Sequence, residues 1–178
     1  MTTYKPFVTA NAPWSTADLV DEHPNLNAFL PGLENFGGHD QFYGPVVLVK
    51  CFEDNSLIKK VLNSSGVDQA SGLAQVLVVD AGASLRCAML GDQIAQAAVD
   101  NGWAGVVING CVRDSAILKD MPLGILALAS TPQKSVRCGQ GLSDLGSIHL
   151  QGVAVYAHTL LYADSDGVLV ESPNHVTD

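Results

Sequence analysis

The chain has 178 residues, of which 47 % are hydrophobic and 15 % are charged, and this is enough apolar sequence to fill the core of one domain. We therefore expect a single folded domain over residues 1–178. Nine Lys and Arg residues against eighteen Asp and Glu residues give a net charge of −9, which disfavours direct contact with nucleic acid. The sequence shows no apolar run of the ~18 residues that span a bilayer and no stretch of signal-peptide character, so we expect a cytoplasmic protein without membrane contact.

The first two thirds of the sequence predict alternating helices and strands. In chain order we expect a helix over 17–23, turns over 35–44, a strand over 46–52, a helix over 57–62 capped by residues 54–56, a strand over 75–82, a helix that contains 94–98 and ends at Asn101-Gly102, and a strand over 103–110. Short connections between the last strand, helix and strand indicate a right-handed βαβ unit with parallel strands.

The remainder of the chain changes character. A short helix after Asp114, a turn over 121–124 and a strand over 125–130 continue the alternation, whereas residues 148–172 are β-rich runs separated by Gly, Asp and Ser. These runs are typical of antiparallel hairpins. We therefore predict an α/β fold with central parallel βαβ units and an antiparallel C-terminal β section.

Several kinds of site are disfavoured. Cys51, Cys87, Cys111 and Cys138 form no C-x-x-C pair, so we expect reduced, largely buried thiols and no thiolate metal site. The five histidines lack the i, i+4 spacing of a metal helix, and no G-x-G-x-x-G motif follows the strand over 75–82. Asp164–Gly167 resembles the start of a calcium loop, but no Glu stands at the twelfth position, and a hairpin turn is the favoured interpretation.

One segment carries the first candidate binding loop. Gly91, Asp92, Gln93 and Ile94 follow an apolar run and open the helix that contains 94–98. In open α/β sheets ligands bind beyond the carboxyl ends of parallel strands, and the free N–H groups at a helix N-terminus attract an anion such as a carboxylate. The alternative is that Asp92 serves only as a helix cap.

The second candidate loop leaves the strand over 103–110 at its carboxyl end. Arg113 can bind a carboxylate or a developing enolate, and the adjacent Asp114 can ligate a hard divalent cation. The alternative is an ordinary surface ion pair between the two residues. A polar segment further on, Thr131–Ser135, is interpreted as a solvated loop, with a place at the border of the cleft as the alternative.

Twenty residues separate Asp92 from Arg113, and Asp114 follows, which gives the pattern D-x20-R-D. With the blocks FGGHDQFYGPVVLVKCFEDNSLIKKVL, VLVVDAGASLRCAMLGDQIAQAA, GWAGVVINGCVRDSAIL, TPQKS and LYADSDGVLV, this sequence closely resembles the class II aldolases that cleave 4-hydroxy-4-methyl-2-oxoglutarate and their relatives, the regulators of ribonuclease activity A. The resemblance covers nearly the whole chain. It implies a swivelling β/β/α domain that assembles as a homotrimer or a dimer of trimers, with the site between subunits.

The resemblance also implies roles for the site residues. The backbone of Gly91, Asp92, Gln93 and Ile94 and the side chain of Arg113 would bind a 2-oxo acid. Asp114 would ligate Mg²⁺ or Mn²⁺ directly, and Asp92 would reach the metal through water.

The function implied is metal-dependent aldol cleavage to two pyruvates, with oxaloacetate decarboxylation through the same pyruvate enolate as a side activity. No strand-end Lys motif suggests a Schiff base, which also favours the metal route. Some family members instead inhibit an endoribonuclease of the RNase E type, and some of these replace the Asp of the Arg-Asp pair. This sequence keeps Asp114, which favours the enzyme. A protein inhibitor of such a ribonuclease is the alternative.

Overall fold

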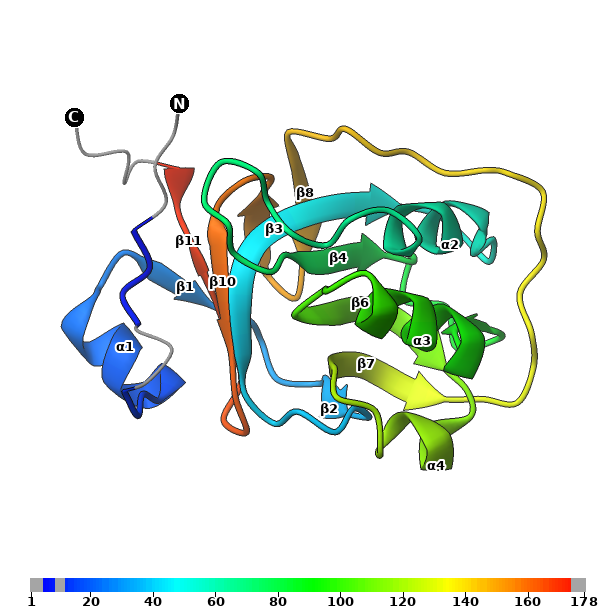
Figure 1. Ribbon diagram of the computed structural model, residues 1–178, viewed down its shortest axis with the longest axis horizontal. Helices are drawn as coiled ribbons and strands as arrows, with labels where there is room; N and C mark the ends of the chain where they lie inside the picture. Colours follow the sequence, from blue (N-terminus) through cyan, green and yellow to red (C-terminus); the bar gives the residue numbers. More distant parts are fainter. Residues whose placement is uncertain (1–4, 9–11, 174–178) are drawn as a thin grey trace.

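The computed structural model describes residues 5–8 and 12–173, and its main feature is one large mixed sheet (Figure 1). Within these residues nine strands form this sheet, in the order β1-β11-β10-β3-β4-β6-β7-β2 with β5 paired to β6. Their bounds are β1 Leu26–Ala28, β2 Glu34–Asn35, β3 Phe42–Lys50, β4 Val76–Asp80, β5 Ala88–Leu90, β6 Gly105–Val112, β7 Gly124–Ser130, β10 Leu160–Ala163 and β11 Val168–Glu171. Strands β8 (Ser147–Leu150) and β9 (Val153–Tyr156) form a separate antiparallel pair.

The centre of the sheet is parallel. Strands β3, β4, β6 and β7 run in the same direction, and the chain between them forms α2 (Ser56–Leu62), α3 (Asp92–Asp100) and α4 (Ser115–Leu118). Figure 1 shows these three helices near the arrowheads of the parallel strands. The predicted βαβ arrangement is confirmed, and it places the loops that follow β5 and β6 at one edge of the sheet.

Both faces of the parallel strands are buried, as their unbroken apolar sequences require. Along β4, Leu77 and Val79 pack in the cluster that contains the inward faces of α2, α3 and α4. Val76 and Val78 point the other way, into a second cluster that includes residues of the β8–β9 pair. Because side chains alternate across a strand, one apolar run serves two core layers.

The antiparallel section is also confirmed. β10 and β11 form a hairpin whose turn is Asp164–Gly167, and β10 joins the main sheet by pairing with β3. The Asp164 carboxylate accepts hydrogen bonds from the backbone N–H of Thr16 at 2.6 Å and from its hydroxyl at 2.7 Å. Thr16 begins α1 (Thr16–Glu22), so this turn anchors the first helix to the sheet, and the hairpin interpretation is the right one.

Several details differ from the sequence predictions. The turn prediction over 35–44 is wrong at its ends, because Asn35 belongs to β2 and β3 already begins at Phe42. The first part of β3 pairs antiparallel with β10, a distant partner that local sequence does not reveal, and Gly44 fits there because a Cβ would collide with the carbonyl oxygen of Ala74. Strand β5 was not expected, since its three residues are shorter than a recognisable strand pattern.

A further difference concerns the cysteines. All four are free, as expected, and Cys51, Cys87 and Cys111 are buried, but Cys138 is exposed on the surface loop after β7. Burial raises the pKa of Cys51 to about 12, with the nearby Asp54 and Asp80 charges adding to the effect. Within the described residues no helix is long and apolar enough to cross a membrane.

Candidate functional site

The two candidate loops lie side by side because β5 and β6 are paired. Leu90 is in register with Val112, and the N–H of Arg113 donates to the carbonyl of Leu90 at 2.9 Å. Gly91 and Arg113, which follow these strands, therefore come together at the same edge of the sheet. The structure brings the predicted site residues together as the D-x20-R-D spacing suggested.

Asp114 connects the two loops. Its Oδ2 accepts a hydrogen bond from the N–H of Asp92 at 3.2 Å and lies 3.3 Å from the Nε of Arg113. The backbone of Asp114 is in the left-handed region, with φ of 59°, a conformation that costs free energy for a residue other than glycine. A Cβ on Gly91 would come within 2.7 Å of Asp114 Oδ2, so a larger residue at position 91 would force the Asp114 carboxylate to shift.

The two alternative interpretations, a helix cap at Asp92 and a surface ion pair between Arg113 and Asp114, are each partly right. Asp92 Oδ1 accepts the N–H of Gln93 at 2.7 Å, but the N-cap of α3 is Gly91 and Asp92 lies in the first turn, where its charge complements the helix dipole. The Arg113–Asp114 ion pair exists, with the side chains 37 % and 33 % exposed, so it contributes little stability on its own. Asp92 and Arg113 also line a pocket, which neither alternative explains.

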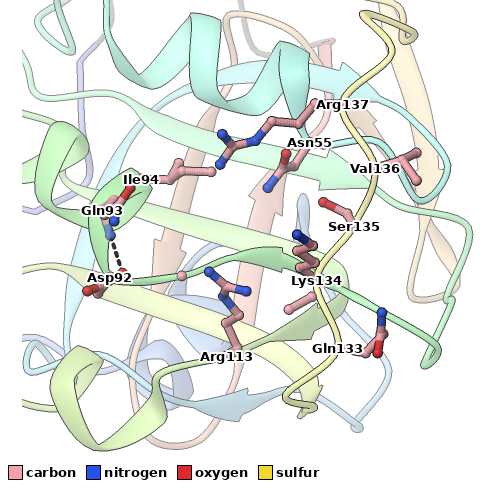
Figure 2. Close-up of a pocket in the computed structure, with 12 residues that line it drawn as sticks. Asn55, Asp92, Gln93, Ile94, Arg113, Gln133, Lys134, Ser135, Val136 and Arg137 are labelled. Atoms are coloured by element: carbon pink, nitrogen blue, oxygen red, sulfur yellow. Dashed lines mark hydrogen bonds between the residues drawn. The ribbon is translucent and has the colours of Figure 1, made fainter.

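The pocket has a volume of about 580 Å³, within the range of small-molecule sites (Figure 2). Its lining residues come from both predicted loops, from the start of α2 and from a loop that follows β7. They are Asn55, Ala88, Gly91, Asp92, Gln93, Ile94, Arg113, Gln133, Lys134, Ser135, Val136 and Arg137. All the predicted site residues except Asp114 are among them, and Asp114 contacts the backbone of Asp92 next to the pocket.

Sequence reasoning missed one whole wall of this pocket. We call residues 131–142 the pocket loop, and within it Gln133 to Arg137 line the cavity. The alternative placement of Thr131–Ser135 at the cleft border is therefore correct, although several of these side chains are also exposed. Arg137 is one of only three arginines in the chain, and this scarcity was the available signal that it has a role.

Two buried polar atoms face this region without a partner. Asn55 is 8 % exposed, and its Oδ1 has no hydrogen-bond partner within the described residues; the same is true of the buried Oγ of Ser135. An unpaired buried polar group costs roughly 1–3 kcal/mol. Because both residues line the pocket, a bound polar ligand or water can satisfy them.

The pocket loop has little regular structure, yet it is held at several points. The N–H of Ala88 donates to the carbonyl of Gln133 at 2.7 Å, and the N–H of Val136 donates to the carbonyl of Glu53 at 3.0 Å. Asp54, only 2 % exposed, accepts the N–H groups of Cys138 at 2.8 Å and Gln140 at 3.0 Å on its Oδ2. The loop is therefore fixed against the start of α2.

The charge of Asp54 depends on these bonds. Burial alone would raise the pKa of its carboxyl, but hydrogen bonds from Ser56 and from the backbone N–H groups of Gln140 and Cys138 lower the pKa well below its usual range. Asp54 is thus ionised at neutral pH, and its negative charge strengthens each N–H bond that it accepts.

The residues present also fit a divalent cation of the magnesium type. Within the described residues no group of three or more His, Cys, Asp and Glu side chains could enclose a metal. Mg²⁺, however, keeps several waters and is bound through one or two carboxylates together with substrate oxygens. Asp92 and Asp114 supply two carboxylates from adjacent loops, and the missing Cβ of Gly91 leaves room for Asp114 Oδ2 beside the backbone N–H of Asp92.

The fold and the pocket together define a class of protein, an α/β sheet protein whose strand-end loops border a pocket lined by Arg113, Lys134 and Arg137. The family described as RraA-like (Aldolase/RraA) matches residues 16–170, and the chain belongs to this family.

Similar proteins carry three kinds of name. A protein of Albidiferax ferrireducens named "Putative 4-hydroxy-4-methyl-2-oxoglutarate aldolase" is 48 % identical over 164 residues, which cover 88 % of this chain and 94 % of that protein. The solved structure of the RNA-processing inhibitor RraA from Thermus thermophilis is 42 % identical, with a TM-score of 0.83 over 94 % of this chain and 99 % of that one. A Geobacillus kaustophilus structure described as an S-adenosylmethionine: 2-dimethylmenaquinone methyltransferase is 39 % identical, with a TM-score of 0.81 over 89 % and 94 % of the two chains.

Proposed function

We propose that this protein is a divalent-metal-dependent lyase that cleaves 4-hydroxy-4-methyl-2-oxoglutarate into two molecules of pyruvate. The observation that carries the proposal is the placement of Arg113, Asp92 and the N-terminus of α3 around one pocket, with Asp114 beside it in contact with the Asp92 backbone and with Arg113. Membership of the RraA-like family and 48 % identity to a relative named as an aldolase support the same reaction.

The residues of the pocket suit the charges of this reaction. The N–H groups at the start of α3 and the Arg113 guanidinium would bind the carboxylate of the 2-oxo acid. During cleavage the C3–C4 bond breaks, the C4 hydroxyl loses its proton to give the carbonyl of one pyruvate, and the electron pair passes to C3 as the enolate of the other. Arg113 would stabilise the negative charge that develops on the 2-keto oxygen, and a proton then returns to C3.

Asp114 would hold Mg²⁺ or Mn²⁺ directly, and Asp92 would hold it through water. When bound, the cation would act as a Lewis acid that polarises the 2-keto group. Oxaloacetate loses CO₂ to give the same pyruvate enolate, so we expect its decarboxylation as a side activity that needs the same residues.

The test is pyruvate release by the purified protein supplied with Mg²⁺. The Asp114→Ala variant should lose about 10²-fold or more in kcat, because it removes the direct metal ligand. Lys60→Gln, which changes an exposed residue of α2 outside the pocket, serves as the control and should keep full activity. Undiminished turnover in Asp114→Ala would contradict the proposal.

A second candidate function is the protein inhibitor of an RNase E-type endoribonuclease. The observation in its favour is the 42 % identity to the RNA-processing inhibitor RraA over 94 % of this chain. With a net charge of −9, such a complex would form through protein contacts with a basic region of the nuclease and would weaken with salt. A pull-down with purified nuclease should then be salt-sensitive and survive Arg113→Ala. No capture at low salt would reject this candidate.

The predicted assembly into a homotrimer or a dimer of trimers stays a proposal. Light scattering on the purified protein would distinguish these masses from that of a single 18.7 kDa chain.

A further inference from the structure

In the proposed cleavage, the enolate carbon C3 must gain a proton after the C3–C4 bond breaks. The carbon beside it, C2, has three substituents in one plane, namely the carboxylate carbon, the keto oxygen and C3. When the carboxylate and the keto oxygen are bound by the N-terminus of α3 and by Arg113, C3 points away from that wall. It is therefore turned toward the open cavity and the wall on its other side.

The other wall of the cavity is the pocket loop, and Lys134 is one of the residues by which this loop lines the cavity. Figure 2 shows the loop with Lys134 on one side of the cavity, and Gln93 and Ile94 at the start of α3 on the opposite side. A substrate bound at the start of α3 thus presents C3 to the wall that carries Lys134.

Strand β5 fixes the position of Lys134 relative to Arg113. Ala88, at the start of β5, forms a parallel bridge with Lys134, and its N–H donates to the carbonyl of Gln133 at 2.7 Å. At the end of β5, the carbonyl of Leu90 accepts the N–H of Arg113 at 2.9 Å. The two cationic residues therefore flank one short strand, and two strand spacings place their backbones roughly 10 Å apart across the sheet. A molecule of the size of pyruvate fits between their side chains.

The anchor of Lys134 is separate from the anchor at Asp54. The bridge to Ala88 holds the beginning of the pocket loop, whereas Asp54 accepts the N–H groups of Cys138 and Gln140 further along. Lys134 therefore keeps its place when the later part of the loop is loosened.

Among the described side chains that line the cavity, Lys134 is the one suited to give a proton to carbon. Arg113 and Arg137 keep their protons in proteins, the Asp92 carboxylate is an acceptor, and the remaining side chains are amides, one hydroxyl and apolar groups. Within residues 5–8 and 12–173, Lys134 forms no ion pair and no side-chain hydrogen bond. Its ammonium group is thus free to turn toward a bound substrate.

We propose that Lys134 is the general acid that protonates C3 of the pyruvate enolate. An N–H bond of the ammonium breaks, its proton forms the new C3–H bond with an electron pair of the enolate, and the enolate oxygen becomes the keto oxygen of pyruvate. Lys134 is left as a neutral amine and regains a proton from water, which has taken up the proton of the C4 hydroxyl earlier in the turnover. This assignment rests on the proposed function and adds a catalytic residue to it.

Exchange of the methyl protons of pyruvate measures this step alone. In D₂O with Mg²⁺ and pyruvate, the amine form of Lys134 removes a methyl proton and the ammonium returns deuterium, so the methyl signal in the proton NMR spectrum decays. Lys134→Arg keeps the positive charge but holds its protons too tightly, and exchange should slow by about 10²-fold or more. The affinity for pyruvate in calorimetric titrations should change by less than about threefold, because the charge is kept.

Added cations separate a proton donor from a positive charge. In Lys134→Ala, ethylammonium can occupy the space of the lost side chain and should restore exchange in proportion to its concentration. Guanidinium has the same charge but keeps its protons, so it should restore nothing. Lys60→Gln, which removes a positive charge on α2 outside the pocket, should exchange at the wild-type rate.

Three results overturn the assignment. They are exchange at the wild-type rate in Lys134→Arg, restoration of Lys134→Ala by guanidinium as well as by ethylammonium, and a wild-type protein that exchanges no methyl protons. Failure of the proposed function is a separate result, because it is the absence of pyruvate release from 4-hydroxy-4-methyl-2-oxoglutarate, whereas exchange is measured on pyruvate itself. A protein that exchanges methyl protons through Lys134 but cleaves nothing would keep the general acid and lose the lyase.

Discussion

The two walls of the pocket are built by different means. Gly91, Asp92 and Arg113 directly follow paired strands, so the register of β5 and β6 sets their positions. Lys134 and Arg137 lie on the pocket loop, which depends on hydrogen bonds to distant backbone and to one buried carboxylate. One wall is therefore fixed by the register of the sheet, whereas the other is fixed by the hydrogen bonds of a loop.

The largest effect is expected on the sheet-edge wall. In the proposed reaction Arg113 stabilises the developing enolate, so Arg113→Gln should lower kcat for pyruvate release by about 10²-fold or more. The side chain is 37 % exposed, and the melting temperature should change little. Arg86→Gln is the matched control, because Arg86 pairs with Glu53 and does not line the pocket. Similar kcat values for Arg113→Gln and Arg86→Gln would break the distinction between the walls.

Gly91→Ala tests how tightly the sheet-edge wall is packed. The new Cβ would come within 2.7 Å of Asp114 Oδ2 and 3.1 Å of Arg113 Nε, so both side chains must move. We expect a loss of about tenfold in kcat, because small displacements of catalytic groups are costly. In Gly146→Ala the Cβ meets nothing within 4 Å, so this control should keep its activity. A fully active Gly91→Ala would mean that the Asp114 contact is not needed.

Asp54→Asn tests the loop wall without touching the sheet edge. An amide keeps the shape but loses the charge, so the N–H bonds from Cys138 and Gln140 weaken and the loop loosens. KM should rise several-fold with kcat changed less than twofold, and limited proteolysis should cut within residues 131–142 more rapidly. A fall in kcat at constant KM would place Asp54 on the chemical side instead.

The same carboxylate predicts an acid dependence of stability. The native pKa of Asp54 lies below its ordinary value of 3.8, so the unfolded state binds more protons in the interval between the two. The stabilisation is fully present above about pH 5 and is lost as pH falls below 4 toward the native pKa. Denaturant unfolding at pH 7 should show Asp54→Asn roughly 1–3 kcal/mol less stable than wild type, with the difference shrinking toward pH 3. A constant difference would contradict this origin.

Thiol labelling compares the exposed loop with the buried core, and of these tests it is expected to affect function least. In the native protein one of the four thiols, Cys138, should react rapidly with a disulfide reagent at pH 8. Burial raises the pKa of Cys51, Cys87 and Cys111, so these should react only on unfolding. Cys138→Ser should abolish the rapid phase. Rapid reaction of a second thiol would show that the core beneath the loop opens.

The contrast between the walls also explains what the sequence could reveal. The parallel strands, α3 and the hairpins follow from apolar runs and turn residues, and Arg113 and Asp114 were predictable because they directly follow a recognisable strand. The contribution of Arg137 and Asn55 to the pocket was not predictable. These two residues come together through hydrogen bonds between residues more than eighty positions apart, such as Cys138 with Asp54. Local periodicity contains no signal for such contacts. The early start of β3 was missed for the same reason, since its partner β10 is distant in sequence.

If the pocket performs metal-dependent cleavage of a 2-oxo acid, the rate of that cleavage must follow the availability of the cation. Pyruvate release from 4-hydroxy-4-methyl-2-oxoglutarate is followed continuously while a chelator is added and Mg²⁺ is then restored in excess. We expect release to stop on chelation and to resume with Mg²⁺. Release that continues unchanged in the chelator, or no release under any of these conditions, would contradict it.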